Sequence, residues 1–217
     1  MNESNKIKDS DCNQNKRDFI NFQKMTSNVN PRVPIWLEKT INRFERFKGI
    51  AYDLGCGAGN QAIYLLENGW KVIAVDKEVD VFNKKKQELK KELQDNLEIV
   101  KMSFENLKLE EKSDLIIAIN SLPFCSPDKF EEMWKNIDNL LKIGGKIAIT
   151  LFGVNDDFNK ENSGMTFFNK DEIYKLLGNF EIEGKTGDII EKEFDGKMVN
   201  GNNHHWHKYI IVAKKIK

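Results

Sequence analysis

The segment Asp53-Leu54-Gly55-Cys56-Gly57-Ala58-Gly59-Asn60 follows a short apolar run and opens a helical pattern. Glycine at positions 55 and 57 lets the backbone turn tightly and approach a ligand with no Cβ atom in the way, and glycine at 59 allows close packing where the helix begins. A loop at the carboxyl end of a first strand occupies the crevice where open α/β sheets bind ligands. The sequence therefore predicts an α/β fold with a binding site at this loop.

Short continuous apolar runs alternate with helical patterns along most of the chain. Strands that are apolar on both faces belong in a parallel sheet that is covered by helices on both sides. We therefore predict a doubly wound α/β domain that ends in a C-terminal hairpin. The expected strands are residues 50–54, 71–76, 97–100, 114–120 and 146–152, followed by 180–186 and 205–213.

Periodicity and capping signals place the helices between these strands. Two N-terminal helices are expected within residues 19–48, with a break near Pro31. Asn169 and Glu172 form a capping pair at the start of a later helix that stops at Gly178. The remaining expected helices are 60–67, 81–93 and one from Pro127 to the Gly144-Gly145 pair.

The distribution of apolar residues gives the expected domain organisation. Residues 1–18 carry few large apolar side chains, so we expect a flexible tail there. Residues 19–217 are expected to form a single domain. Within it, 19–48 supply helices and a lid, 49–152 the ligand-binding half, and 153–217 the C-terminal helix and hairpin.

Charge and composition exclude several functions. The chain has 34 basic and 34 acidic residues, whereas non-specific nucleic-acid binding depends on a basic excess, so the balance argues against nucleic acid as a partner. The longest apolar runs are strand-length, short of the ~20 residues that cross a bilayer, and the N-terminus lacks a secretory signal. Three scattered cysteines fit a reducing compartment. We expect a cytoplasmic monomer or homodimer with no membrane association.

Two carboxylates beside the loop define the expected ligand. Asp76 ends the second predicted strand, where a carboxylate accepts hydrogen bonds from an unphosphorylated ribose. Asp53 would repel a pyrophosphate, but it suits an ammonium or a sulfonium. The Gly-x-Gly-x-Gly spacing, with Asn60 following, also departs from the Gly-x-Gly-x-x-Gly fingerprint of dinucleotide sites. We therefore expect a ligand with an adenosine at one end and a cation at the other.

The Asp-Leu-Gly-Cys-Gly-Ala-Gly loop, Asp76 and the order of strands and helices resemble the class I S-adenosylmethionine-dependent methyltransferases. The resemblance covers roughly Pro31 to the C-terminus and is closer to small bacterial enzymes of the tellurite-resistance or thiopurine type. It implies a Rossmann-like sheet of seven strands in the order 3-2-1-4-5-7-6, with the last strand antiparallel. It also implies S-adenosyl-L-methionine as cofactor and a small-molecule methyl acceptor as partner.

The same resemblance assigns roles to individual residues. Asp53 and the glycine loop would line the methionine moiety, Asp76 would hold the ribose, and Asn120 would face the methyl group and the acceptor. The residues expected to bind the cofactor are Asp53, Gly55, Cys56, Gly57, Gly59, Asp76, Lys77, Ser103, Phe104 and Asn120. The residues expected to line the substrate pocket are Trp36, Ser121, Leu122, Phe124 and Trp206.

Catalysis of methyl transfer depends mostly on proximity and alignment, and a soft anionic acceptor needs no general base. A hydroxyl or ammonium acceptor would need one, and His205 and His207 are the candidates because the pKa of imidazole lies near neutrality. The segment that holds them, residues 204–207, also fits an ordinary hairpin edge or part of the pocket. No Cys or carboxylate is spaced to complete a metal site there, so no metal is expected.

Three alternatives stay open. The run Asn120-Ser121-Leu122-Pro123-Phe124 is similar to the Asn-Pro-Pro-Tyr/Phe signature of amine methyltransferases that act on nucleic acid or protein, but it has one extra residue before the Pro-aromatic pair. A non-catalytic S-adenosylmethionine-binding regulator would carry the same loop as an enzyme. A nucleotide-dependent oxidoreductase is disfavoured by Asp53 and Asn60.

Overall fold

The computed structural model describes residues 20–27, 33–42, 49–160, 163–183 and 188–217. The two expected N-terminal helices are present, one over residues 20–27 and the other being α2 (Ile35–Asn42). The expected break at Pro31 and the expected flexible tail lie outside the described residues.

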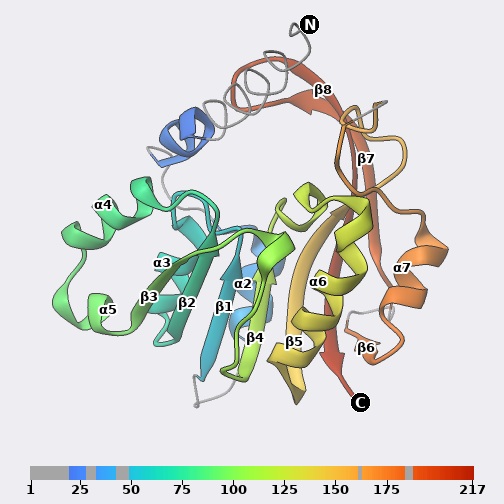
Figure 1. The fold of residues 1–217 in the computed structure, drawn as a ribbon. Coiled ribbons are helices and arrows are strands. Elements are labelled where there is room, and N and C mark those ends of the chain that lie inside the picture. Colours follow the sequence, from blue (N-terminus) through green and yellow to red (C-terminus); the bar gives the residue numbers. More distant parts are fainter. Residues whose placement is uncertain (1–19, 28–32, 43–48, 161–162, 184–187) are drawn as a thin grey trace, which may run out of the picture.

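An eight-stranded sheet forms the centre of the molecule, in the order β3-β2-β1-β4-β5-β8-β6, with β7 pairing β8 (Figure 1). Strands β1 to β5 pair in parallel, and β8 is antiparallel to β5, β6 and β7. The predicted Rossmann-like order is confirmed, with β8 in the place of the seventh strand. The strands are β1 (Ile50–Leu54), β2 (Lys71–Asp76), β3 (Leu97–Lys101), β4 (Ser113–Ala118), β5 (Leu141–Phe152), β6 (Phe180–Ile182), β7 (Ile190–Lys197) and β8 (Asn203–Lys215).

The strand count differs from the prediction because β7 was not expected. Its sequence, IEKEFDGK, is largely charged and exposed, so it lacks the apolar face by which a strand is recognised. It forms because β8 supplies a partner along its whole length, from Ile190 opposite Ile210 to Lys197 opposite Asn203. The C-terminal hairpin is therefore β7–β8. The segment expected as its first arm is the short β6, which pairs with the far end of β8.

The helices follow the prediction with two corrections. The expected helix 81–93 is divided, because Leu89 adopts an extended conformation between α4 and α5. The helix that begins at Pro127 ends at Leu140, since Leu141 already pairs with Ser113 in the sheet. The expected capping pair is confirmed at α7. The helices are α3 (Asn60–Glu67), α4 (Asp80–Glu88), α5 (Lys91–Asp95), α6 (Pro127–Leu140) and α7 (Lys170–Leu176), with single 3₁₀ turns η1 (Phe104–Asn106) and η2 (Leu122–Phe124).

Two apolar cores lie on opposite faces of the sheet. One core joins the sheet to α6 and α7, and the other joins it to α2, α3 and α4 (Figure 1). Strand alternation divides β1 between them: Tyr52 and Leu54 enter the first core and Ala51 the second. Asp53 shares the face of Ala51, so the end of β1 presents a carboxylate toward α3.

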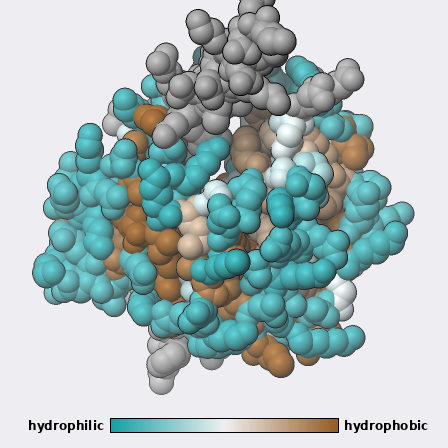
Figure 2. All heavy atoms as spheres, viewed as in Figure 1, coloured by the Kyte–Doolittle hydropathy of each residue, from teal (hydrophilic) through white to brown (hydrophobic). Residues whose placement is uncertain are grey.

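The surface of the face seen in Figure 2 is mostly hydrophilic, with hydrophobic residues showing in smaller patches between polar ones. Among the described residues, no helix is both long enough and apolar enough to cross a membrane.

Candidate cofactor and acceptor site

The glycine loop joins β1 to α3. Three of its residues have the positive φ that favours glycine: 76° at Gly55, 53° at Gly57 and 81° at Gly59. A Cβ atom at Gly55 would lie 2.3 Å from Cβ of Ser121, and one at Gly59 would lie 2.2 Å from the ring of Phe82. A Cβ atom at Gly57 would meet nothing within 4 Å. Gly55 and Gly59 are thus required by packing, whereas Gly57 exposes bare backbone to open space.

Asp53 is buried at the start of this loop, with 2% of its surface exposed. Its Oδ2 atom has no hydrogen-bond partner in the part of the chain that the structure describes. Burial, and then the nearby charge of Asp76, raise the pKa of Asp53 to about 7, against a smaller opposing effect of a hydrogen bond from the Ala62 backbone. A buried carboxylate oxygen without a partner fits a ligand that brings a positive charge.

Asp76 ends β2 beside the same loop and is also buried. Its Oδ2 accepts a hydrogen bond from Gly57 N at 2.9 Å, and its Oδ1 accepts one from Glu78 N at 3.0 Å. Burial raises the pKa of Asp76, and these two hydrogen bonds oppose the shift. Because a carboxylate offers about four lone-pair sites, Asp76 retains capacity for a hydroxyl donor. Lys77, the next residue, is exposed.

The N-terminal helix over residues 20–27 covers the loop through Gln23, which no motif marked, and through a hydrogen bond from Asn60 of the loop. Nε2 of Gln23 donates to Glu78 O at 2.9 Å and lies 3.5 Å from Asp76 Oδ1. The other amide atom, Gln23 Oε1, is buried and has no hydrogen-bond partner among the described residues. Asn60 at the start of α3 donates to Thr26 O at 3.2 Å. The helix thus closes over the loop with a buried amide directed at Asp76.

The segment after β3 also reaches the glycine loop. The Cζ atom of Phe104 lies 3.2 Å from the position that a Cβ atom of Gly55 would take. Ser103 precedes η1, and its hydroxyl accepts a hydrogen bond from Asn106 Nδ2 at 3.1 Å. Cys56, within the loop, is buried, and burial raises the pKa of its thiol well above the usual value, which leaves it unreactive.

Asn120 follows β4 with φ of 51°, and it is the one non-glycine residue with positive φ in the described ranges. Its N–H donates to Thr150 Oγ1 at 2.6 Å, which fixes this strained turn to β5. Next to it, Ser121 Oγ donates to Leu54 O at 2.6 Å. The end of β4 is therefore held directly against the end of β1, and Asn120 lies beside the glycine loop.

Two of the expected substrate-pocket residues meet in an aromatic cluster beyond Asn120, formed by Phe124, Phe152, Phe158 and Trp206. The ring centroids of Phe124 and Phe152 are 6.3 Å apart, those of Phe152 and Trp206 are 6.2 Å apart, and those of Phe158 and Trp206 are 5.9 Å apart. The structure does not bring the other predicted pocket residues to this cluster. Leu122 is fully buried in the core, Trp36 packs against the core on the α2 side, and Ser121 bonds the end of β1.

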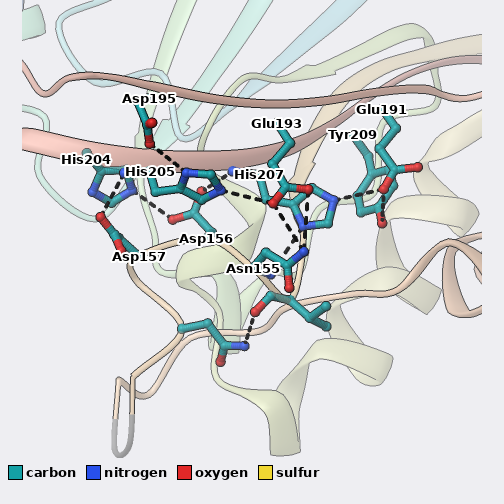
Figure 3. A network of polar contacts seen from close by, with 12 residues as sticks. Asn155, Asp156, Asp157, Glu191, Glu193, Asp195, His204, His205, His207 and Tyr209 are labelled. Atoms are coloured by element: carbon teal, nitrogen blue, oxygen red, sulfur yellow. Dashed lines mark hydrogen bonds and ion pairs between the residues drawn. The ribbon is translucent and has the colours of Figure 1, made fainter.

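The three histidines lie on β8 and are held by carboxylates of β7 and of the segment after β5 (Figure 3). His204 Nε2 is 2.8 Å from Asp156 Oδ1. The imidazole of His205 bonds through Nδ1 to Asp195 at 2.7 Å and through Nε2 to Glu193 at 3.0 Å. The imidazole of His207 bonds through Nε2 to Glu191 at 3.0 Å, and its Nδ1 accepts the N–H of Asn155 at 3.2 Å.

These contacts argue against the general-base role predicted for His205 and His207. His205 bonds two carboxylates, Asp195 and Glu193, and they raise its pKa to about 8, with Asp195 having the larger effect. This imidazole is therefore largely protonated at pH 7. His207 already uses the lone pair of Nδ1 to accept the N–H of Asn155, and its Nε2 bonds to Glu191. The described residues include no group of three or more His, Cys, Asp or Glu side chains arranged to hold a metal ion.

Comparison with known proteins gives the class of this fold and site. Residues 51–145, which include the glycine loop, Asp76 and Asn120, match the family described as "Methyltransferase domain". This match and the sheet order support the class I S-adenosylmethionine-dependent methyltransferase fold that the loop motif predicted. No protein of curated function matches the sequence significantly.

Solved structures of methyltransferases share this fold. TehB from Haemophilus influenzae superimposes with a TM-score of 0.69 at 17% identity, over 84% of this chain and 62% of TehB. The 1,6-didemethyltoxoflavin-N1-methyltransferase of Burkholderia thailandensis gives 0.60 at 18% identity, over 88% and 80%. Magnesium protoporphyrin IX methyltransferase from Synechocystis gives 0.60 at 16% identity, over 83% and 76%. At such identities the likeness establishes the fold, and the chain spans less than two thirds of TehB.

Proposed function

We propose that this protein transfers the methyl group of S-adenosylmethionine to a small-molecule acceptor. The observation that carries the proposal is the unpartnered Oδ2 of Asp53, which is buried at the start of the loop in which Gly57 presents bare backbone to open space. A ligand that brings a cation to Asp53 and lies along Gly57 relieves the cost of leaving this carboxylate buried alone.

The residues present fit the cofactor at both ends. Asp53 would receive the ammonium of the methionine moiety, with the sulfonium nearby, and Asp76 would accept hydrogen bonds from the ribose hydroxyls. Phe104 would contact the adenine from the side of Gly55. When bound, the cofactor supplies an activated methyl group that an acceptor takes by in-line displacement.

The chain's own contribution is binding, alignment and exclusion of water. Gln23 and its helix would shield the cofactor from solvent, because they already cover Asp76 in the free protein. Asn120, held in its strained turn by Thr150, would align the acceptor. No residue needs to remove a proton if the acceptor arrives as an anion, and this agrees with the occupied nitrogens of His205 and His207.

Three observations favour a small acceptor. The chain has no net charge, so it lacks the basic excess that would gather a nucleic acid. The half-buried rings of Phe124, Phe158 and Trp206, which pack around the buried Phe152, offer flat apolar surface to a molecule of limited size. Two proteins of the same fold carry names that state small substrates, didemethyltoxoflavin and magnesium protoporphyrin IX.

The test is a titration followed by a turnover assay. Isothermal titration calorimetry should show binding of S-adenosylmethionine and S-adenosylhomocysteine, and no binding of nicotinamide nucleotides. Release of S-adenosylhomocysteine is then measured against a panel of small thiols, phenols, amines and oxyanions. Binding of nicotinamide nucleotides alone would refute the proposal. Cofactor binding with no turnover across the panel, and turnover on a protein or nucleic-acid substrate, would favour the regulator and the amine methyltransferase respectively.

A further inference from the structure

Lys208 on β8 contacts Asn120, the residue expected to face the acceptor, and the proposed function does not use it. Its Nζ donates to Asn120 Oδ1 at 3.2 Å and lies 3.5 Å from the centroid of the Trp206 ring and 5.5 Å from that of Phe152. The two residues joined by the hydrogen bond are 88 positions apart in the sequence. Lys208 thus stands between the end of β4 and the aromatic cluster.

The ammonium of Lys208 forms no ion pair with a carboxylate in the described part of the chain. The nearest acidic influence is Asp156, whose oxygens are already engaged by His204 Nε2 at 2.8 Å, Phe158 N at 3.1 Å and His207 N at 3.0 Å. Burial lowers the pKa of Lys208 to about 8, so the amine is still mostly protonated at pH 7. A partly buried cation with one neutral hydrogen-bond partner and two ring faces is poorly compensated.

Three successive contacts connect Lys208 to the glycine loop. Gly55 packs against Ser121, Ser121 bonds the end of β1, and the preceding residue, Asn120, bonds Lys208. A molecule placed beside Asn120 would therefore meet the ammonium of Lys208 together with the half-buried ring of Trp206, and Phe152 lies buried behind them. Charge and flat apolar surface together are complementary to a planar anion.

We propose that Lys208 selects the methyl acceptor by its charge, and that the acceptor is a planar organic anion such as an aromatic carboxylate, phenolate or thiolate. The inference rests on the proposed function, because it names the substrate class of that site. Lys208 acts here as a specificity-determining residue. It pairs with the anion and leaves the methyl-donor side to Asp53 and Asp76.

Three probes of the same shape and different charge test the proposal: benzoate, benzamide and benzamidine. Each is titrated into the full-length protein saturated with S-adenosylhomocysteine, with the amide resonances followed by NMR. Benzoate should bind at least about tenfold more tightly than benzamide, and benzamidine should bind most weakly. Lys208→Met should abolish the preference for benzoate, and Lys208→Arg should retain it.

Lys214→Met is the matched control. Lys214 lies on the same strand and the same face, six residues and about 20 Å farther along β8. This variant should rank the probes as the wild type does, and all three variants should bind S-adenosylhomocysteine with unchanged affinity. Lys208→Gln serves as a second neutral variant if Lys208→Met does not fold.

Several outcomes would overturn the inference: benzamide binding as tightly as benzoate, benzamidine binding most tightly, no binding of benzoate, or an undiminished benzoate preference in Lys208→Met. Failure of the proposed function is distinguishable from these. If S-adenosylhomocysteine itself does not bind, the probes are titrated without it, and a Lys208-dependent preference for benzoate would leave an anion site on a protein that is not a methyltransferase.

Discussion

Gly57 donates its backbone N–H to Oδ2 of Asp76 at 2.9 Å, so the middle of the glycine loop is tied to the end of the neighbouring strand. Position 57 is also where the loop faces open space. One carboxylate therefore has two tasks in this proposal: it holds the loop in its left-handed conformation, and it accepts the ribose hydroxyls. Both tasks depend on burial, because a solvated carboxylate would bond water instead.

Asp76→Ala should weaken S-adenosylhomocysteine binding about 10- to 100-fold, the loss expected for hydrogen bonds to a charged group. Asp80→Ala, which alters an exposed carboxylate four residues farther on, is the matched control and should bind normally. Calorimetric titration of both variants checks this. An unchanged dissociation constant in Asp76→Ala would remove Asp76 from the ribose site.

Gly57→Ala and Gly144→Ala separate backbone strain from ligand contact. Both glycines have positive φ, of 53° and 84°, and in both cases an added Cβ atom would meet nothing within 4 Å. Each substitution should therefore destabilise the fold by about 1–2 kcal/mol. Only Gly57→Ala should also raise the dissociation constant of the cofactor, at least about tenfold, because its methyl group enters the space that the ligand needs. Thermal denaturation and calorimetry give the two quantities separately.

Asp53 should make cofactor binding pH-dependent. With its pKa near 7 in the free protein, the carboxyl is mostly neutral below that pH and must ionise to pair with a cation. Affinity for S-adenosylhomocysteine should therefore rise as pH increases from 5.5 to about 7 and then level off. Measurements should stop near pH 7.5, below the ~7.7–8.0 at which an α-amino group loses its own proton. Asp53→Asn should bind more weakly and lose this rise, and an equally steep rise in that variant would exclude Asp53 as its source.

Asp53 should also destabilise the folded protein when no ligand is bound. Since the pKa of Asp53 is raised on folding, the folded state holds a proton that the unfolded chain has released, and stability falls as pH rises from about 4 to about 7. Above about pH 7 the carboxyl of Asp53 is ionised in both states, and the loss of stability does not grow further. Asp53→Asn should therefore have a higher melting temperature than the wild type at pH 8, although it binds the cofactor less well.

Gln23 should control how long the cofactor stays bound. Gln23→Ala removes the amide that bonds Glu78 O and approaches Asp76, so the helix over residues 20–27 should dock less firmly. We expect S-adenosylhomocysteine to dissociate about three to ten times faster, as for the loss of one ordinary hydrogen bond. Stopped-flow displacement measures this rate, with Gln87→Ala on the exposed side of α4 as the control. Equal rates in both variants would show that Gln23 takes no part.

His205 should titrate near pH 8 in NMR experiments, and both Asp195→Asn and Glu193→Gln should move its pKa down toward 6.5. Because this imidazole is on the surface, added salt should reduce the difference. A pKa that stayed near 8 in both variants would mean that the two carboxylates are not its cause.

A local pattern was sufficient to predict the glycine loop and the strands beside it, although the helix expected over residues 81–93 divides at Leu89. The loop of residues 53–60 and the strand ending at Asp76 were predicted correctly because apolar runs and glycines recur at fixed spacing. Lys208 and Gln23 could not be predicted, because their roles come from residues 88 and 55 positions away. The sequence also could not show that both ring nitrogens of His207 are occupied, because their partners, Asn155 and Glu191, come from two different segments.

The charged strand β7 has a consequence for assembly. It lies beside the N-terminal half of β8, and five of its eight residues, Glu191, Lys192, Glu193, Asp195 and Lys197, are charged. An unpaired strand edge is a template for any other extended chain, and charged side chains on it discourage such pairing. The hairpin therefore does more than hold the three histidines in place: it protects this margin of the sheet against growth by strand addition from another molecule.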